Sequence, residues 1–500
     1  MTLSTEAAVA DAAPALLGRK AASLAIANAI DYSLQFLLPV VLVRFLAPTE
    51  FGKYRLLWLV AGTVMALVTQ AMAGSLYYFL PRSDPVSRRL HINQTLLYLT
   101  ACGLVGAFAV SALDPWLPAT VANLSQHRLL VPTFVLLWVV ASLLDLICAA
   151  EERVRWQAHV VIALSLVRTI ALGAAAVLTR RFDIVLLALL GFAALKAGLL
   201  VSYVGHFHGL RGPFLRRDAF LDQLRQSMPF AIAGALYGLR LQADQWVASA
   251  LFPLETFALL SIAALLSPLV NVCRQSALQA FLPRVSRLQA AGDVEGMLRL
   301  NGRANVLVAA VVLPLLAYAF AFSEDLITFV YTAAYAAAAT AMRIYIVGLI
   351  ALVLELSTIM LLLREGPFSV TISSIALLAS IAISWFAARS IGIAGAAAGS
   401  VAAIYVEHAA TLWRIARRSC VGFSQVQDWR SLGLLLICAA VSGLAAWAAV
   451  TEVIASFPLV VRLGTGAAVL AIVYAGLVTA CGLGRELRTA MSRAETGPAS

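Results

Sequence analysis

The sequence predicts an all-α polytopic membrane protein with about 14 transmembrane helices. Hydrophobic residues make up 62% of its 500 residues and charged residues only 12%, about half of the charged share of a soluble protein. Apolar runs of about 20 residues, long enough to cross a bilayer as a helix, recur along the chain. These runs lack the alternation of a β-barrel, and lipid requires each segment to satisfy its own backbone groups, so helices are expected.

Fourteen spans are expected, separated by short loops. The tenth is the hardest to bound, because the preceding residues 326–339 are also fairly apolar. The spans cover residues 22–46, 56–80, 91–113, 129–150, 158–178, 183–206, 227–250, 257–282, 304–322, 340–363, 368–388, 391–413, 432–450 and 459–482.

Lys and Arg residues predict the orientation of the spans. With the N-terminus in the cytoplasm, the cytoplasmic loops and tails hold 23 of these residues and the opposite side holds 7, with Arg180 and Arg181 as the local exception. Short loops rich in Lys and Arg face the cytoplasm, so both termini are expected there. The first 20 residues contain Glu6 and Asp11 and no cleavage site ahead of a short apolar region, which favours a tail over a signal peptide.

Two paired markers indicate an internal repeat. Leu46-Ala47-Pro48-Thr49-Glu50 precedes Phe79-Leu80-Pro81-Arg82, and Leu251-Phe252-Pro253-Leu254-Glu255 precedes Phe281-Leu282-Pro283-Arg284. Because Pro interrupts helices, each Phe-Leu-Pro-Arg copy is expected to end a helix at the cytoplasmic surface. The markers lie on helices one–two and seven–eight, six spans apart, which favours two six-helix lobes in parallel orientation over chance recurrence.

The repeat divides the chain into five parts. We expect an N-terminal lobe over 1–206, a cytoplasmic linker over 207–226, a C-terminal lobe over 227–413, a basic linker with helices thirteen and fourteen over 414–482, and a cytoplasmic tail over 483–500.

Ionisable residues within the spans are the main functional signal, because a charge at the bilayer centre costs roughly 2.5–3.5 kcal/mol even on insertion scales. The cations near mid-span are Arg168, Lys196, Arg240 and Arg274, and the acids are Asp31, Asp145, Asp244, Glu355 and Glu407.

These charges favour a cavity between the lobes that binds an anionic diphosphate, since the guanidinium fork matches phosphate oxygens. Arg168 and Arg274 have no obvious local partner in the sequence, and Arg240 and Lys196 are further candidates. Structural pairing is the alternative for Arg240, which lies four residues before Asp244 on one expected helix, and the Lys196 side chain could snorkel. Asp31, Asp244, Glu355 and Glu407 could bind a coupling cation or could pair with the cations.

No pattern indicates an enzyme, a cofactor or a metal centre. The sequence contains no GxxxxGK[ST] of an ATPase, no HExxH and no plausible nucleophile elbow. The six cysteines are scattered and the histidines do not cluster. The external loops are short, the first covering about Ala47 to Lys53, which argues against a membrane glycosyltransferase. The basic residues lie between apolar runs, so they indicate topology and anionic lipid and no nucleic-acid partner.

Three motifs carry a resemblance that spans nearly the whole chain in order. Val43-Arg44-Phe45-Leu46-Ala47-Pro48-Thr49-Glu50-Phe51-Gly52-Lys53-Tyr54 resembles the first-loop motif of bacterial polysaccharide exporters. Gln242-Ala243-Asp244-Gln245 with Leu251–Glu255 resembles its seventh-helix counterpart, although Glu255-Thr256-Phe257-Ala258 lacks the Gly-Tyr often seen there. Ile391-Gly392-Ile393-Ala394-Gly395-Ala396-Ala397 resembles the start of helix twelve. The chain is therefore similar to the polysaccharide biosynthesis and oligosaccharide flippase family of the multidrug/oligosaccharidyl-lipid/polysaccharide exporter superfamily.

This resemblance implies a function. It implies twelve core helices in two lobes with two helices appended, alternating access without ATP, and transfer of undecaprenyl-diphosphate-linked oligosaccharide to the periplasmic leaflet of the bacterial inner membrane. The product would be O-antigen of lipopolysaccharide, capsule or exopolysaccharide, with a polymerase and chain-length machinery as possible partners. A lipid-linked peptidoglycan precursor flippase and a cation-coupled drug exporter remain alternatives, and a glycosyltransferase or polymerase is a more distant one.

Overall fold

The computed structural model describes residues 3–112, 120, 124, 126–209, 212–264 and 266–483, and it contains only helices over these residues. The all-α expectation is confirmed. Eleven helical segments of the described chain are long and apolar enough to cross a membrane. The expected count of 14 is not confirmed: the seventh, eighth and tenth expected spans are each divided into two consecutive helices, none of which is both long and apolar enough to be among the eleven. The expected tail after residue 483 lies outside the described residues.

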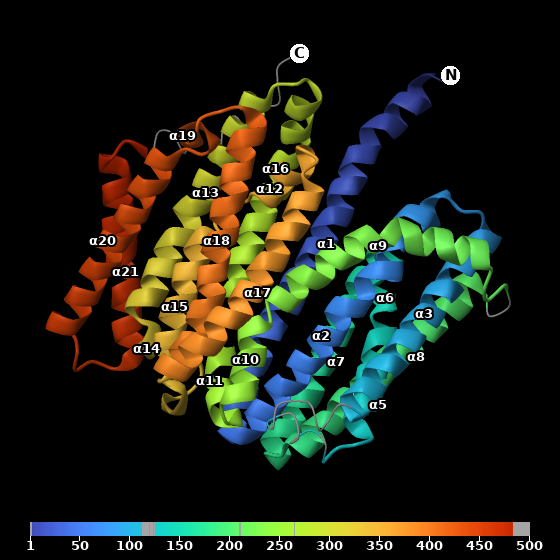
Figure 1. Ribbon diagram of the computed structural model, residues 1–500, viewed down its shortest axis with the longest axis horizontal. Coiled ribbons are helices and arrows are strands. Elements are labelled where there is room, and N and C mark those ends of the chain that lie inside the picture. The colour runs from blue at the N-terminus through green and yellow to red at the C-terminus, as the bar shows by residue number, and fades with distance from the viewer. Residues whose placement is uncertain are drawn as a thin grey trace. The chain divides into compact units, whose positions relative to one another are not determined.

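The chain forms two compact units, each described here by itself. The first unit comprises residues 1–242 and 252–258. Its helices are α1 (Leu3–Phe45), α2 (Pro48–Phe79), the short η1 (Leu80–Arg82), α3 (Pro85–Ala112), α5 (Leu130–Ala141), α6 (Leu143–Ala150), α7 (Val154–Thr179), α8 (Phe182–His208) and α9 (Arg217–Arg240) (Figure 1).

The second unit comprises residues 243–251 and 259–500, and α11 (Leu254–Ala263) begins in the first unit and ends in the second. Its other helices are α10 (Ala243–Leu251), α12 (Ser267–Ala290), α13 (Val294–Ala321), α14 (Ser323–Val330), the short η3 (Ala333–Tyr335), α15 (Ala338–Ala351), α16 (Ser357–Leu362), α17 (Gly366–Ile391), α18 (Ile393–Ser419), α19 (Phe423–Val426), α20 (Trp429–Val453) and α21 (Leu459–Ala480).

The first unit extends past the linker at 207–226 where the sequence places the lobe boundary. Helix α9 packs along α2 and also contacts α3. A buried polar network joins these helices, because the Gln223 amide donates to Ser75 Oγ and Thr95 Oγ1, both at 2.8 Å. This packing assigns residues 217–242 to the first unit.

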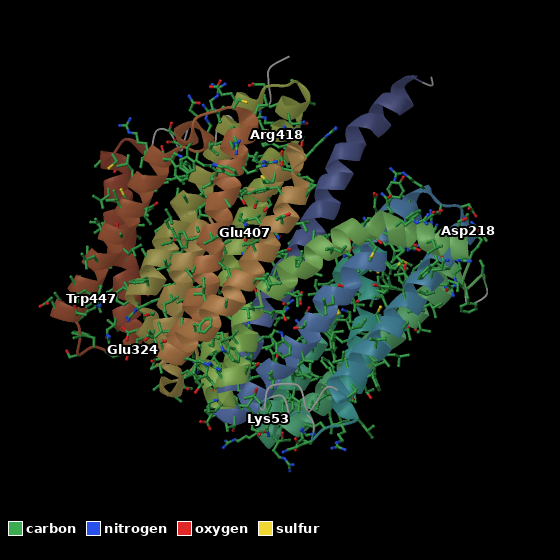
Figure 2. The ribbon with its side chains drawn as sticks, viewed as in Figure 1. Lys53, Asp218, Glu324, Glu407, Arg418 and Trp447 are labelled. Carbon is green, nitrogen blue, oxygen red and sulfur yellow. The ribbon has the colours of Figure 1, made fainter. Side chains whose placement is uncertain are left out.

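Helix α2 begins earlier than the sequence analysis expected. Residues 48–53, expected in an external loop, form its first turns. Pro48 occupies the first turn, where the missing N–H is not needed, and Glu50 places a carboxylate at the positive end of the helix dipole. Arg55 therefore lies about two turns inside the helix. In Figure 2, Lys53 lies near this end of the first unit and Asp218, on α9, lies at the opposite end.

The two Phe-Leu-Pro-Arg copies differ in structure. The first ends a helix as expected, because α2 stops at Phe79 and continues only as η1. The second lies inside α12, which runs on to Ala290, so the expectation of a helix end at Pro283 is wrong. One missing N–H removes a single helical hydrogen bond, and the neighbouring bonds let the helix continue.

Helices α17 and α18 pack closely through two glycines of α18, Gly395 and Gly399. A Cβ on Gly395 would lie 2.1 Å from the carbonyl oxygen of Ala387, and one on Gly399 would lie 2.2 Å from the backbone nitrogen of Ser384. Backbone atoms of α17 therefore occupy the space of both side chains, as small residues permit at membrane helix interfaces.

Gly399→Ala is expected to lower the free energy of unfolding by about 1–3 kcal/mol, the usual effect of overpacking. Thermal unfolding of the purified protein measures the effect. The matched control is Gly433→Ala on α20, where a new Cβ would meet no atom within 4 Å. A Gly399→Ala protein as stable as the Gly433→Ala protein would contradict the close packing.

Glu151 lies between α6 and α7 and connects this junction to the end of α8. Its Oε1 lies 2.7 Å from His208 Nε2, and the Tyr203 hydroxyl donates to Oε2. Burial raises the pKa of Glu151, but the hydrogen bonds from His208 and Tyr203 outweigh it, so the pKa is lowered from its ordinary 4.5. This contact fixes one end of the two helices, α7 and α8, that carry Arg168 and Lys196.

Glu151→Gln is expected to lower the Tm at pH 7, with a difference from wild type that shrinks as the pH falls below 4.5. A carboxylate whose pKa is lowered by folding stabilises the protein above its unfolded pKa and loses this effect as it is protonated through its folded pKa. Thermal unfolding across this pH range checks the prediction. The exposed neighbour variant Glu152→Gln should leave the Tm unchanged at every pH, and a pH-independent loss in Glu151→Gln would contradict the assignment.

Candidate functional site

The first unit contains a polar cavity of about 480 Å³. We call it the charged cavity. It is lined by side chains from α1, α2, α5, α6, α7 and α8, with three cations and two carboxylates among them. These charged residues are Arg55, Arg168, Lys196, Asp31 and Asp145.

Asp31 of α1 holds Arg168 of α7 in the charged cavity. The Arg168 guanidinium donates to Asp31 Oδ1 at 3.1 Å, Ser165 Oγ donates to the same oxygen, and Gln35 Nε2 donates to Oδ2 at 2.6 Å. Arg168 is 14 residues from the start of α7, about 21 Å along a helix of about 39 Å. Arg168 has no obvious partner nearby in the sequence, and the structure supplies one from another helix.

Arg168 keeps unused donor capacity despite this pair. Its Nε–H is buried and meets no acceptor among the described residues. A buried N–H without a partner is costly unless a ligand or water accepts it. Arg168 can therefore donate to a further anionic group inside the cavity while Asp31 holds its position.

Lys196 and Asp145 form the second ion pair of the charged cavity. Lys196 Nζ lies 2.7 Å from Asp145 Oδ2 and 5.4 Å from the centre of the Trp138 ring. The Lys196 side chain is 12% exposed, whereas that of Asp145 is 54% exposed. Lys196 thus points inward among aromatic rings, and its ammonium group does not snorkel away from the cavity.

Arg55 belongs to the site, although it lies just before the second expected span, 56–80. It lines the charged cavity beside Tyr54 and Trp58. Trp58 packs edge-on against Trp138 with ring centroids 5.0 Å apart. The helix-starting signals at Pro48 and Glu50 place Arg55 inside α2, so they could have revealed it.

The second unit pairs Arg274 of α12 with Glu355. Arg274 Nε lies 3.4 Å from Glu355 Oε2, and its Nη2 donates to Asn271 at 3.2 Å. The void beside them measures only about 10 Å³, close to the space of a single water. As for Arg168, this partner lies far away in the sequence, on a segment 81 residues after Arg274.

Glu355 lies where the expected tenth span is divided, between α15 and α16. Asn301 Nδ2 donates to the Glu355 carbonyl at 3.1 Å, and the Glu355 N–H donates to Asn305 Oδ1 at 3.0 Å. Membrane helices tolerate a break only where such partners satisfy the freed backbone groups. The Asn side chains of α13 therefore permit the break that carries Glu355.

The remaining sequence-predicted residues lie outside the charged cavity. Arg240 ends α9 and Asp244 lies on α10, so the expectation that they share one helix is wrong. Asp244 accepts a hydrogen bond from the Tyr345 hydroxyl, and Glu407 accepts one from Ser373 at 2.7 Å. Figure 2 shows Glu407 partway along α18 and Arg418 near its end. The described residues contain no cluster of three His, Cys, Asp or Glu that could hold a metal ion.

Solved structures with a similar fold are transporters. The lipid II flippase MurJ in its inward closed conformation matches with a TM-score of 0.70 and 13% identity, over 92% of this chain and 99% of that one. An inward-facing multidrug resistance MATE family transporter of the MOP superfamily matches with a TM-score of 0.59 and 12% identity, over 78% and 94%. A MOP superfamily transporter from Pyrococcus furiosus matches with a TM-score of 0.50 and 13% identity, over 80% and 96%.

The chain thus shares its fold with a lipid II flippase and with transporters of the MOP superfamily. The family model for polysaccharide biosynthesis proteins matches residues 17–289, more than half of the chain. The chain belongs to this family, as the motifs of the sequence indicate. It matches no curated protein.

Proposed function

We propose that this protein is a flippase that moves an undecaprenyl-diphosphate-linked oligosaccharide from the cytoplasmic to the periplasmic leaflet of a bacterial inner membrane. Transfer requires no ATP and proceeds by alternating access. Both termini lie in the cytoplasm, and the product enters O-antigen, capsule or exopolysaccharide assembly, with a polymerase as a downstream partner. The family membership and the charged cavity support this proposal.

The buried Nε–H of Arg168 is the observation that carries the proposal. It offers a donor in the middle of α7 without an acceptor in the described protein. A diphosphate supplies acceptor oxygens of the matching charge. Three cations against two carboxylates leave the cavity lining with an excess of positive charge, which favours an anionic headgroup over the cationic substrate of a drug exporter.

The aromatic side chains of the charged cavity suit the sugar part of the substrate. Trp58 and Trp138 line it beside Tyr54, and such rings present large apolar faces with a polar edge. The diphosphate would lie against Arg168, Arg55 and Lys196, with the sugars against the rings. Arg240 and Arg274 are proposed as further diphosphate contacts reached during the transport cycle.

Carboxylates give the transporter a candidate coupling site. Asp31 touches Arg168 directly, so protonation or cation binding at Asp31 would release the guanidinium. Asp244, Glu355 and Glu407 accept hydrogen bonds within the second unit and are proposed as secondary coupling or pairing acids.

Flipping by purified protein in proteoliposomes tests the function. Undecaprenyl-diphosphate oligosaccharide is placed in one leaflet, and its appearance in the other is followed without ATP, with proton and sodium gradients imposed in turn. Protein-dependent flipping of the oligosaccharide supports the proposal. Transfer of lipid-linked peptidoglycan precursor alone, export of cationic drugs alone, or sugar transfer by the protein would each replace it with the corresponding alternative.

A further inference from the structure

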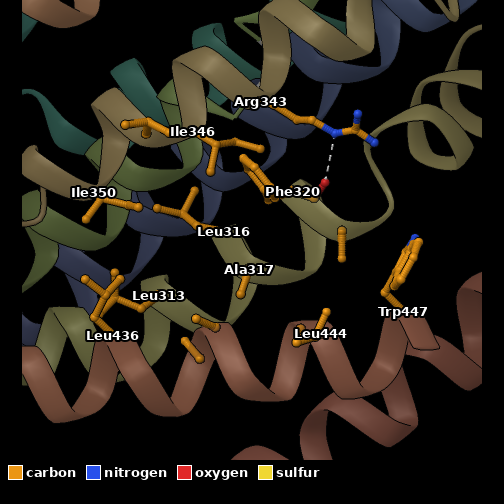
Figure 3. A pocket seen from close by; sticks show the side chains of 15 residues that line it. Leu313, Leu316, Ala317, Phe320, Arg343, Ile346, Ile350, Leu436, Leu444 and Trp447 are labelled. Carbon is orange, nitrogen blue, oxygen red and sulfur yellow. Dashed lines mark hydrogen bonds between the residues drawn. The ribbon is translucent and has the colours of Figure 1, made fainter. Parts of the chain in front are cut away.

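The second unit has an apolar slot of about 610 Å³ that the proposed function does not use. Helices α13, α15 and α20 form it, and Figure 3 shows the side chains that line it. Two slot side chains of α20, Leu444 and Trp447, are 64% and 47% exposed. Because α13 and α20 are apolar enough to span a membrane, we expect these exposed side chains to face lipid.

Small residues line the bottom of the slot and leave its space open. Gly443 lies against Ala317, since a Cβ at position 443 would be 3.3 Å from the Ala317 Cβ. Ala440 also lines the slot and is exposed. Larger side chains at these positions would fill the slot, so its shape depends on their small size.

One end of the slot is polar. Figure 3 shows Arg343, Phe320 and Trp447 at this end and Ile350, Leu313 and Leu436 at the other. Arg343 follows the start of α15 by five residues and Trp447 precedes the end of α20 by six, which places both about 8–9 Å from their helix ends. This is the depth at which Arg and Trp side chains meet lipid headgroups.

Arg343 has no acidic partner in the described part of the chain. Its Nε donates to the Phe320 carbonyl at 3.3 Å, and its guanidinium lies 6.0 Å from the Phe320 ring centre. The other nitrogens of the fork remain available to an anion at the mouth of the slot.

We propose that this slot binds one anionic phospholipid. Its phosphodiester is held by Arg343, and one acyl chain runs over Ala317 and Ala440 toward Ile350. A phosphodiester carries one negative charge, which a single guanidinium neutralises, whereas a polyprenyl diphosphate would leave excess charge at an otherwise apolar mouth. The expected topology places Arg343 in the periplasmic leaflet, so the ligand is a phospholipid of that leaflet.

Fluorescence quenching of Trp447 provides a site-specific test. The purified protein is titrated with phosphatidylglycerol brominated on its acyl chains, and with brominated phosphatidylethanolamine of the same chains. The quenching that disappears in Trp447→Phe reports the slot. We expect phosphatidylglycerol to bind about tenfold more tightly, because both lipids offer a phosphodiester to Arg343 but only phosphatidylethanolamine carries an ammonium group that offsets its charge; this factor corresponds to about 1.4 kcal/mol.

Two variants and two matched controls complete the test. Arg343→Gln should abolish the preference for phosphatidylglycerol, and Ala440→Phe should weaken binding of both lipids by filling the slot. Arg389→Gln removes an Arg outside the slot that contacts Trp385, and Ala471→Phe enlarges an exposed Ala of α21 outside the slot; neither should change the quenching.

Three outcomes would overturn the proposal. The first is equal quenching by the two lipids in the wild type, and the second is a preference for phosphatidylglycerol that survives Arg343→Gln. The third is displacement of phosphatidylglycerol by a lower concentration of polyprenyl diphosphate than of phosphatidylglycerol itself, which would assign the slot to the polyprenyl lipid of the substrate.

Discussion

Arg168→Gln is expected to reduce flipping of the diphosphate-linked substrate at least tenfold while the protein remains folded in the membrane. A charge-assisted hydrogen bond contributes about 1.5–3 kcal/mol, and each 1.4 kcal/mol corresponds to about a factor of ten. The loss should appear both in binding of a polyprenyl diphosphate probe and in transport.

The local geometry makes this variant tolerable to the fold. Asp31 keeps the hydrogen bonds from Ser165 and Gln35 when Arg168 is removed. The cost in stability should therefore stay below the roughly 3–5 kcal/mol of breaking a buried ion pair outright. Arg155→Gln is the matched control, because Arg155 lies on the same helix, is exposed and does not line the charged cavity.

Asp31→Asn separates two roles of the carboxylate. It removes the negative charge and preserves the size of the side chain. If Asp31 only positions Arg168, probe binding and flipping should fall together in every ion gradient, because the neutral side chain no longer holds the guanidinium. If Asp31 couples transport to a cation, probe binding should persist while gradient-driven flipping is lost.

Normal flipping by Arg168→Gln, or an equal loss in Arg155→Gln, would contradict the assignment of the diphosphate to this cavity.

Sequence reasoning identified the charges of the site better than their partners. Periodicity and hydropathy show that Asp31, Arg168 and Lys196 lie within spans, because their cost in lipid makes them conspicuous. The partner of Arg168 is 137 residues away on another helix, and the partner of Lys196 is 51 residues away. Contacts of this kind depend on tertiary packing, which no local pattern specifies.

Two helix boundaries were predicted wrongly for a related reason. Pro is typical of turns, but it also suits the first turn of a helix. Whether Pro48 belongs to a loop or begins α2 decides whether Arg55 lies in a loop or in the charged cavity. The run 340–363 reads as one apolar span, but it is broken around Glu355, where Asn301 and Asn305 of α13 supply the missing hydrogen bonds. The sequence near the break contains neither of these partners.

The second large effect is expected at the Arg274–Glu355 pair. Glu355→Ala should lower the free energy of unfolding by about 3–5 kcal/mol, because it leaves the largely buried Arg274 without its carboxylate. Glu355 Oε1 also accepts the Thr358 N–H at 3.2 Å, a bond at the start of α16 that the alanine removes. Thermal unfolding measures the loss, which should be absent when the exposed pair Arg299–Glu295 on α13 is broken in the same way.

A neutral replacement of the pair decides between structure and transport. Arg274→Gln combined with Glu355→Gln removes both charges and preserves the size of the side chain at position 355, so no buried charge is left unpaired and the double variant should recover much of the stability that Glu355→Ala loses. If Arg274 contacts the diphosphate during the cycle, this stable protein should still flip at least tenfold more slowly, the same factor as above. Full transport by the stable double variant would assign Arg274 and Glu355 to holding the broken helix and leave Arg168, Arg55 and Lys196 as the proposed cations of the substrate site. The corresponding Arg299→Gln and Glu295→Gln protein serves as the control, because its pair is exposed and its loss should alter neither stability nor transport.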